Sequence, residues 1–208
     1  MTHDVPISFT GGLFSLLYII MKFNYCHWPK VLDKDEIKKV VNICETNVNP
    51  IGDKRYAPKD GEEPVIKTAK VTCTRWKYLN EILNSIYENW LIANQNYFGF
   101  NLYSVHNECL VNYNIYDSFD SSEYDFHTDA AMEENIDIKL TAIINLSEEY
   151  YEGGDFILFH GGKFREISEI SSPGDSLIFK SWIPHKVTPV TKGIRKTLSL
   201  WFIGPKFI

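Results

Sequence analysis

The sequence predicts a mainly β fold preceded by helices, an α+β arrangement in which two or more helices flank a jelly-roll core. Helical periodicity is confined to the part of the chain before residue 100, and short runs of β-branched and aromatic residues fill the rest. Turn residues bound these runs, as at Gly153-Gly154, Gly161-Gly162 and Pro173-Gly174-Asp175. Several short strands at this spacing are typical of a barrel or of a double-stranded β-helix, the jelly roll.

The 208 residues fit a single domain. We divide it into an N-terminal extension (1–20), a helical support region (21–100) and the jelly-roll core (101–208). The apolar run from Leu13 to Ile20 is far shorter than the roughly 20 residues that cross a bilayer, so we expect no membrane association. The run is either a buried extension or sequence upstream of a start at Met21.

Two helices are expected in the support region. Asp33 followed by Glu36 forms a capping-box pattern, and apolar residues then recur at helical spacing, which predicts an amphipathic helix from Lys34 to Thr46. The i, i+3, i+4, i+7 pattern predicts a second helix from Lys77 to Asn94. Between them, Asn47 to Lys70 is rich in proline, glycine and charge and indicates a long loop, either a binding lid or a mobile insertion.

The strands are expected after this loop. One is predicted near the end of the loop, and six more follow the second helix. Their predicted ranges are Val65–Thr74, Glu108–Tyr116, Lys139–Leu146, Asp155–Phe159, Phe164–Ile170, Ser176–Phe179 and Lys196–Ile203.

Charge and cysteine content exclude several classes of function. The formal net charge of −6 gives no electrostatic reason to bind nucleic acid, so no nucleic-acid partner is expected. The four cysteines have neither the spacing of a zinc site nor that of a disulfide framework. We expect them to be thiols in a reducing, cytoplasmic location.

Three residues in the second half of the chain carry most of the functional information: His127, Asp129 and His185. Residues two apart on a strand point the same way, so we expect His127 and Asp129 to lie side by side. Two imidazoles and one carboxylate form the ligand set of non-haem Fe(II) oxygenases, although Mn, Co, Ni or Zn suit the same atoms. A structural histidine is the alternative for His185, and the remaining histidines are expected to be structural or solvent-facing.

Both imidazoles must be neutral to bind a metal ion. We therefore expect the metal affinity to fall below about pH 6, where free imidazoles become protonated.

A fixed cation follows the second histidine at Arg195. If Arg195 is buried, it needs an anionic partner, and a carboxylate bound through two hydrogen bonds is the best one. Thr197 lies two residues further on, hence on the same face of a strand, where its hydroxyl would reach the same carboxylate. The alternative is a surface arginine in a basic turn with Lys192 and Lys196.

From Tyr116 to Pro205, the sequence resembles the Fe(II)/2-oxoglutarate-dependent dioxygenase superfamily, in particular its prolyl 4-hydroxylase-like branch. The resemblance covers about 90 residues in order. The matching segments are His127–Asp129, Leu140–Ser147, Tyr151–Phe156, Pro173–Phe179, His185–Val190 and Gly193–Leu198.

The resemblance implies a role for each part of this pattern. His127, Asp129 and His185 would be the iron ligands, and Arg195 would bind the distal carboxylate of 2-oxoglutarate. It implies Fe(II), 2-oxoglutarate and O2 as cofactor and cosubstrates, with ascorbate as a reductant.

Three more residues take their expected roles from the resemblance alone. Tyr116 stands where members of the family place a tyrosine that lines the cosubstrate pocket, although two extra residues separate it from His127. Tyr124 matches a pocket aromatic. Asn145 replaces a tyrosine that touches the cosubstrate in some members, and its shorter amide would need a water molecule to reach it.

The reaction that the resemblance implies is hydroxylation of a C–H bond with release of succinate and CO2. A prolyl or other residue in a peptide or protein is the first candidate substrate, and a small molecule or free amino acid is the second. A cupin-like metalloenzyme that does not use 2-oxoglutarate, or a catalytically silent binding domain with the same fold, are the rival interpretations.

Overall fold

The structure is a computed structural model that describes residues 24–50, 67–129 and 136–207. The predicted N-terminal extension and most of the predicted loop between Asn47 and Lys70 lie outside these described residues. Within the described part, the four cysteines are free thiols. None of the helices there is long and apolar enough to span a membrane.

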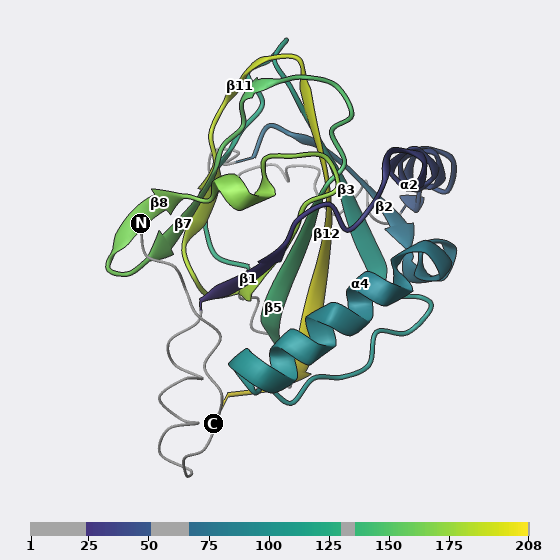
Figure 1. The fold of residues 1–208 in the computed structure, drawn as a ribbon, viewed down its shortest axis with the longest axis vertical. Coiled ribbons are helices and arrows are strands. Elements are labelled where there is room, and N and C mark those ends of the chain that lie inside the picture. Colours follow the sequence, from purple (N-terminus) through teal and green to yellow (C-terminus); the bar gives the residue numbers. More distant parts are fainter. Residues whose placement is uncertain (1–23, 51–66, 130–135, 208) are drawn as a thin grey trace.

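Two antiparallel sheets face each other and confirm the predicted jelly roll (Figure 1). The larger sheet has six strands in the order β1 (Tyr25–Trp28), β9 (Ser176–Lys180), β5 (Ile136–Asn145), β12 (Ile194–Pro205), β3 (Leu110–Asp117) and β2 (Lys70–Arg75). The smaller sheet has four, in the order β4 (Tyr124–His127), β10 (His185–Val187), β7 (Phe156–His160) and β8 (Lys163–Glu166). A short pair, β6 (Glu152–Gly153) with β11 (Val190–Lys192), lies at one end of the roll.

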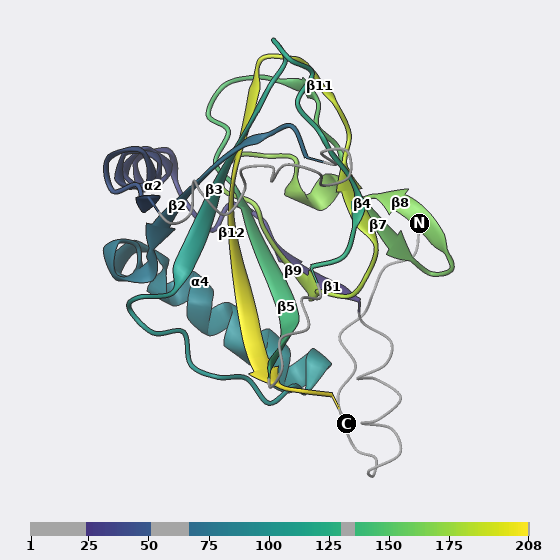
Figure 2. The same ribbon diagram turned by 180° about the vertical axis from the view of Figure 1, so that it is seen from behind.

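Two α-helices lie together on the side of the large sheet that faces away from the small sheet (Figures 1 and 2). Helix α2 (Lys34–Thr46) has the predicted bounds, because the capping box forms: Asp33 Oδ1 accepts the Glu36 N–H at 2.8 Å, and Glu36 Oε2 accepts the Asp33 N–H at 2.9 Å. Helix α4 (Asn80–Ala93) begins later than predicted, because the preceding turn is a 3₁₀ helix, η1 (Trp76–Tyr78). A π-helical turn, η2 (Asn94–Phe98), extends α4 to Gly99.

The large sheet is buried on both faces, which gives the molecule two apolar cores. Residues Ala142 and Ile144 of β5 face the helices and join the first core. Their neighbour Ile143 faces the inside of the roll and joins the second core, together with Phe156 and Leu177. This double burial explains why the second half of β5 contains three consecutive apolar residues, Ala142–Ile144, all of them buried.

Some predicted boundaries are wrong. The strand predicted from Phe164 to Ile170 ends at Glu166, and a 3₁₀ turn, η3 (Ser168–Ile170), replaces its second half. In addition, the support region contains β1 and β2, the two edge strands of the large sheet, besides its helices.

Candidate metal and cosubstrate site

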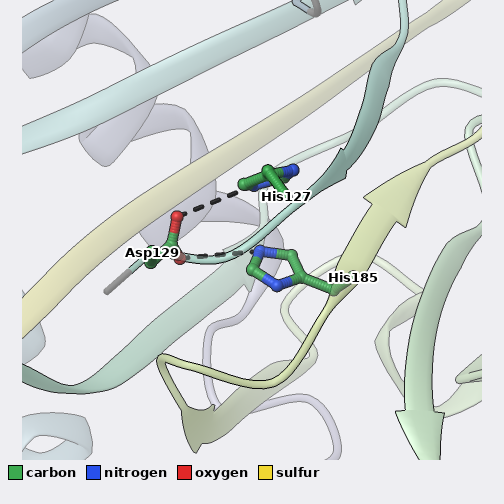
Figure 3. A group of neighbouring side chains, drawn as sticks. All are labelled: His127, Asp129 and His185. Carbon is green, nitrogen blue, oxygen red and sulfur yellow. Dashed lines mark ion pairs between the residues drawn. The ribbon is translucent and has the colours of Figure 1, made fainter. Parts of the chain in front are cut away.

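The histidine pair lies on neighbouring strands of the small sheet. Strands β4 and β10 are antiparallel, and their register places His127 directly opposite His185. One ligand atom from each histidine and one from Asp129 lie within 4.8 Å of one another (Figure 3). The three predicted ligands are therefore brought together.

The predicted reason for the proximity of His127 and Asp129 is wrong in detail. Strand β4 ends at His127, so Asp129 does not share a strand face with it. The Asp129 N–H instead donates to the Ser181 carbonyl at 2.8 Å, in the turn that leads into β10. This contact between two loops holds the carboxylate beside both imidazoles.

Hydrogen bonds orient each ligand. The Nδ1 atoms lie 2.7 Å from the Asp125 carbonyl for His127 and 2.8 Å from the Ile183 carbonyl for His185. A carbonyl oxygen can only accept, so Nδ1 carries the proton and Nε2 of each neutral imidazole keeps its lone pair. These Nε2 atoms face Asp129, at 3.6 Å from Oδ1 and 3.5 Å from Oδ2.

The Asp129 carboxylate has its own orienting partner. The Thr141 hydroxyl on β5 donates to Asp129 Oδ2 at 2.8 Å. Such partners fix the rotamer of a metal-binding carboxylate before the metal arrives.

The protein keeps both imidazoles neutral. Burial and, next, the charge of a protonated His185 lower the pKa of His127 to about 4. Burial also lowers the pKa of His185. Protons therefore compete less with a metal ion than at free imidazoles, and the pH at which metal affinity falls moves below the value of about 6 expected from the sequence.

A cavity of about 40 Å³ opens beside the three ligands. Residues from both sheets line it. They are Lys67, Asn114, Tyr116, Tyr124, His127, Asp129, Thr141, Ile143, Phe156, His185, Val187, Arg195, Thr197, Ser199 and Trp201. Four further predicted site residues, Tyr116, Tyr124, Arg195 and Thr197, thus face the same cavity as the histidines.

Arg195 is the buried cation of this cavity. It is 2% exposed, and it pairs across strands with Tyr116, whose ring centroid lies 5.4 Å from the guanidinium carbon. Among the described residues, its Nε has no hydrogen-bond partner and no carboxylate forms an ion pair with it. A buried, unpaired guanidinium fits the carboxylate of a diacid.

Gly154 gives the arginine side chain its room. A Cβ atom at this position would lie 2.8 Å from Arg195 Cδ and 2.9 Å from Val190 Cγ2. Its φ of +66° also favours glycine. The predicted Gly-Gly turn therefore helps to place the cation.

Two predicted tyrosines, Tyr116 and Tyr124, line the cavity. Burial raises the pKa of the Tyr116 hydroxyl to about 12, so it remains a neutral hydrogen-bond donor. The Tyr124 ring stacks on His127 with centroids 3.4 Å apart and an interplanar angle of 14°. Both rings therefore restrict the space around the ligands.

Asn145 lies elsewhere. Its side-chain amide donates to the Tyr151 hydroxyl at 3.2 Å and to the Ile170 carbonyl at 2.9 Å, and its Oδ1 accepts the Ser147 N–H at 2.9 Å. It is fully buried and does not line the cavity. We therefore assign Asn145 to the packing of the loops and leave it out of the proposed cosubstrate contacts.

The sequence interpretation missed six polar or aromatic residues of the cavity wall: Lys67, Asn114, Thr141, Phe156, Ser199 and Trp201. Period-two spacing from Arg195 and Thr197 along β12 would have found Ser199 and Trp201. No local signal marks Lys67, because its place depends on how its segment folds against β4.

Sequence comparison gives the class of this domain. Residues 111–203 match the model of the 2OG-Fe(II) oxygenase superfamily. The predicted resemblance is confirmed at this level. Fe(II) and 2-oxoglutarate, which define the family, fit the two-histidine, one-carboxylate set and the unpaired Arg195 described above.

A PKHD-type hydroxylase from Alteromonas mediterranea is 32% identical over 90 residues. The alignment covers 39% of this chain and 38% of that relative, so the chain matches only about two fifths of the relative's length.

Solved structures share the fold over most of the chain. A Pseudomonas putida prolyl-4-hydroxylase superposes with a TM-score of 0.62 at 16% identity, covering 90% of this chain and 96% of that one. A Trichoplax adhaerens prolyl hydroxylase, solved with a peptide fragment of the oxygen degradation domain of hypoxia inducible factor, gives 0.59 at 17% identity, with 90% and 86% covered. These likenesses confirm the jelly-roll architecture.

Proposed function

We propose that this chain is an Fe(II)- and 2-oxoglutarate-dependent dioxygenase that hydroxylates a C–H bond. The observation that carries the proposal is that His127, Asp129 and His185 share one cavity with a buried Arg195 lacking an anionic partner among the described residues. A metal-binding triad alone would fit any metalloenzyme with this fold. The cation adds a place for the distal carboxylate of the cosubstrate.

The triad would hold the metal through three protein atoms. These are Nε2 of His127, Nε2 of His185 and an oxygen of Asp129, each held in its orientation by the hydrogen bonds described above. Three protein ligands leave other coordination positions open. When bound, iron and 2-oxoglutarate supply the oxidising power: one atom of O2 ends in the hydroxylated product and the other in succinate, as CO2 leaves.

The chain's own residues would bind and orient the cosubstrate. The Arg195 guanidinium receives the distal carboxylate, and the Thr197 hydroxyl, which faces the same cavity, contributes a further hydrogen bond. Tyr116 lies next to this arginine across the strands. The apolar Ile143 and Phe156 complete the wall and keep water away.

For the substrate, we propose a prolyl or other residue in a peptide or protein. Support comes from similarity to a PKHD-type hydroxylase and from a fold shared with prolyl hydroxylases, one of them solved with a peptide. A free amino acid or other small molecule is the second candidate, because the cavity walls alone do not require a peptide.

The test is consumption of 2-oxoglutarate with Fe(II) and ascorbate, followed by mass spectrometry of candidate peptides for the gain of one oxygen atom. We expect succinate from the unmodified protein, and none from Asp129→Ala. Arg195→Gln should lose most of the turnover at low 2-oxoglutarate. Arg165→Gln, the same change at an exposed position on β8, is the matched control. Unchanged 2-oxoglutarate turnover in Arg195→Gln would remove Arg195 from the proposed cosubstrate site, and no turnover by the unmodified protein would favour the cupin-like alternative.

A further inference from the structure

Lys67 brings a second cation to the wall of the metal cavity. Its backbone forms an isolated antiparallel bridge with Tyr124 of β4. The next residue strengthens the connection: the Thr68 N–H donates to the Glu123 carbonyl at 3.1 Å, and the Glu123 N–H donates to Thr68 Oγ1 at 2.9 Å. Lys67 is thus fixed beside the strand that carries His127.

The Lys67 ammonium has a defined position within this wall. It lies 4.5 Å from the centroid of the Tyr124 ring and donates to Asn114 Oδ1 at 2.9 Å. The Asn114 amide in turn donates to Ser199 Oγ at 3.1 Å and to Thr197 Oγ1 at 3.3 Å. This polar row ties the lysine to β3 and β12, the strands that form the floor of the cavity.

The two cations occupy different places. Arg195 lies over Tyr116, whereas Lys67 lies over Tyr124, whose ring also stacks on the imidazole of His127. Lys67 therefore lies beside the ring that stacks on a metal ligand, and Asn114 stands between its ammonium and the Thr197 hydroxyl of the proposed distal-carboxylate site.

The two carboxylates of 2-oxoglutarate already have places in the proposed function, one at Arg195 and one at the metal. An anion that contacts Lys67 would therefore belong to the molecule that is oxidised. A charge-assisted hydrogen bond in a partly enclosed wall is about twice as strong as a neutral one, which makes such a contact selective.

We infer that Lys67 is a specificity-determining residue that receives a carboxylate of the primary substrate. The inference rests on the proposed function and adds the substrate's charge to it. The carboxylate can belong to an acidic side chain close to the oxidised residue of a peptide, or to the α-carboxylate of a free amino acid. The chemistry at the ammonium is the same in both cases, and the experiment separates them.

The test measures binding in the absence of O2, with the full chain immobilised and loaded with Mn(II) and 2-oxoglutarate. Equal amounts of capped pentapeptides with a random central residue are offered, with glutamate, glutamine or lysine at the flanking positions. A separate arm offers the twenty free amino acids against their amides. Mass spectrometry counts the retained molecules. We expect about tenfold enrichment of glutamate over glutamine peptides, or of free acids over amides, and exclusion of the lysine peptides.

Variants assign the preference to the lysine. Lys67→Gln should remove the enrichment, Lys67→Glu should reverse it, and Lys67→Arg should retain it. Lys70→Gln removes the same charge from an exposed site on β2 and should bind like the unmodified protein. The thermal midpoint and Mn(II) affinity of each variant show whether the fold and metal site are intact.

Three results would overturn the inference. They are retention of the probes without enrichment of the acidic ones, no retention of any probe, and enrichment of the acidic probes that persists in Lys67→Gln. A loss of 2-oxoglutarate binding in Lys67→Gln would also overturn it, because the lysine would then serve the cosubstrate. Failure of the proposed function is distinguishable, since the unmodified protein would then neither bind 2-oxoglutarate with Mn(II) nor release succinate with Fe(II).

Discussion

Replacing Arg195 with methionine should have opposite effects on the free protein and on its cosubstrate complex. Methionine keeps most of the length of the side chain and removes the charge. In the free protein, the buried Nε lacks a hydrogen-bond partner among the described residues. A buried donor without a partner costs about 1–3 kcal/mol. The lost contact with the Tyr116 ring offsets about 0.5–1 kcal/mol of this.

The net expectation is that Arg195→Met stabilises the free protein by about 1 kcal/mol. For a chain of 208 residues, this corresponds to a rise in the thermal midpoint of about 2–4 °C. Binding of 2-oxoglutarate should stabilise the unmodified protein more strongly. A ligand at a hundred times its dissociation constant adds about 2.7 kcal/mol, or about 5–10 °C, and the variant should lose most of this shift.

The assay is thermal unfolding of Mn(II)-loaded protein without O2, with and without 2-oxoglutarate. Arg165→Met, at an exposed position on β8, is the control and should leave both midpoints unchanged. Two results would refute the reasoning. If Arg195→Met unfolds several degrees below the unmodified protein, Arg195 is a structural residue, and if it retains the full 2-oxoglutarate shift, the cosubstrate lies elsewhere.

Two further predictions concern the same cavity. The pKa of His127 is lowered to about 4, so its imidazole stays neutral at pH values where an ordinary imidazole is protonated. Mn(II) affinity measured by calorimetry should therefore stay constant from pH 7.5 to pH 6 and fall only nearer pH 4. A tenfold fall between pH 7 and pH 6 would contradict this prediction. Gly154→Ala should destabilise the fold by about 1–3 kcal/mol and weaken 2-oxoglutarate binding, because the added Cβ atom would contact the Arg195 side chain. Gly162→Ala is the control, since Gly162 also has a positive φ but a Cβ atom there would have nothing within 4 Å. In the same unfolding and binding assays, this control should show only the cost of backbone strain.

Local patterns were sufficient where a short segment determines its own structure. The capping box at Asp33 and Glu36 and the apolar spacing after it predicted α2 with its exact bounds. The predicted ends of helices and strands were wrong where tertiary contacts determine the local backbone. The second helix was predicted to begin at Lys77, within the turn Trp76–Tyr78. The backbone of this turn is instead bonded to the loop before β3, because the Trp76 N–H donates to the Cys109 carbonyl. Helix α4 therefore begins only at Asn80.

Asn145 shows the limit of reasoning by position. Its place in the pattern predicted a cosubstrate contact, because a tyrosine there touches the cosubstrate in similar proteins. The short amide instead satisfies three partners from nearby loops. A buried amide takes whatever hydrogen-bond partners surround it, and the sequence does not state which loops those are.

By itself, the sequence determined the ligand types, the cation and the strand pattern, since side-chain chemistry and period-two spacing are local properties. It predicted that His127, Asp129, His185 and Arg195 belong to one site. Only the tertiary structure decided how they meet. Asp129 reaches the histidines through a hydrogen bond to Ser181, a residue distant in the chain, and not through a shared strand face. The same is true of Lys67, because the packing of its segment against β4, and not its sequence neighbours, brings its charge to the cavity.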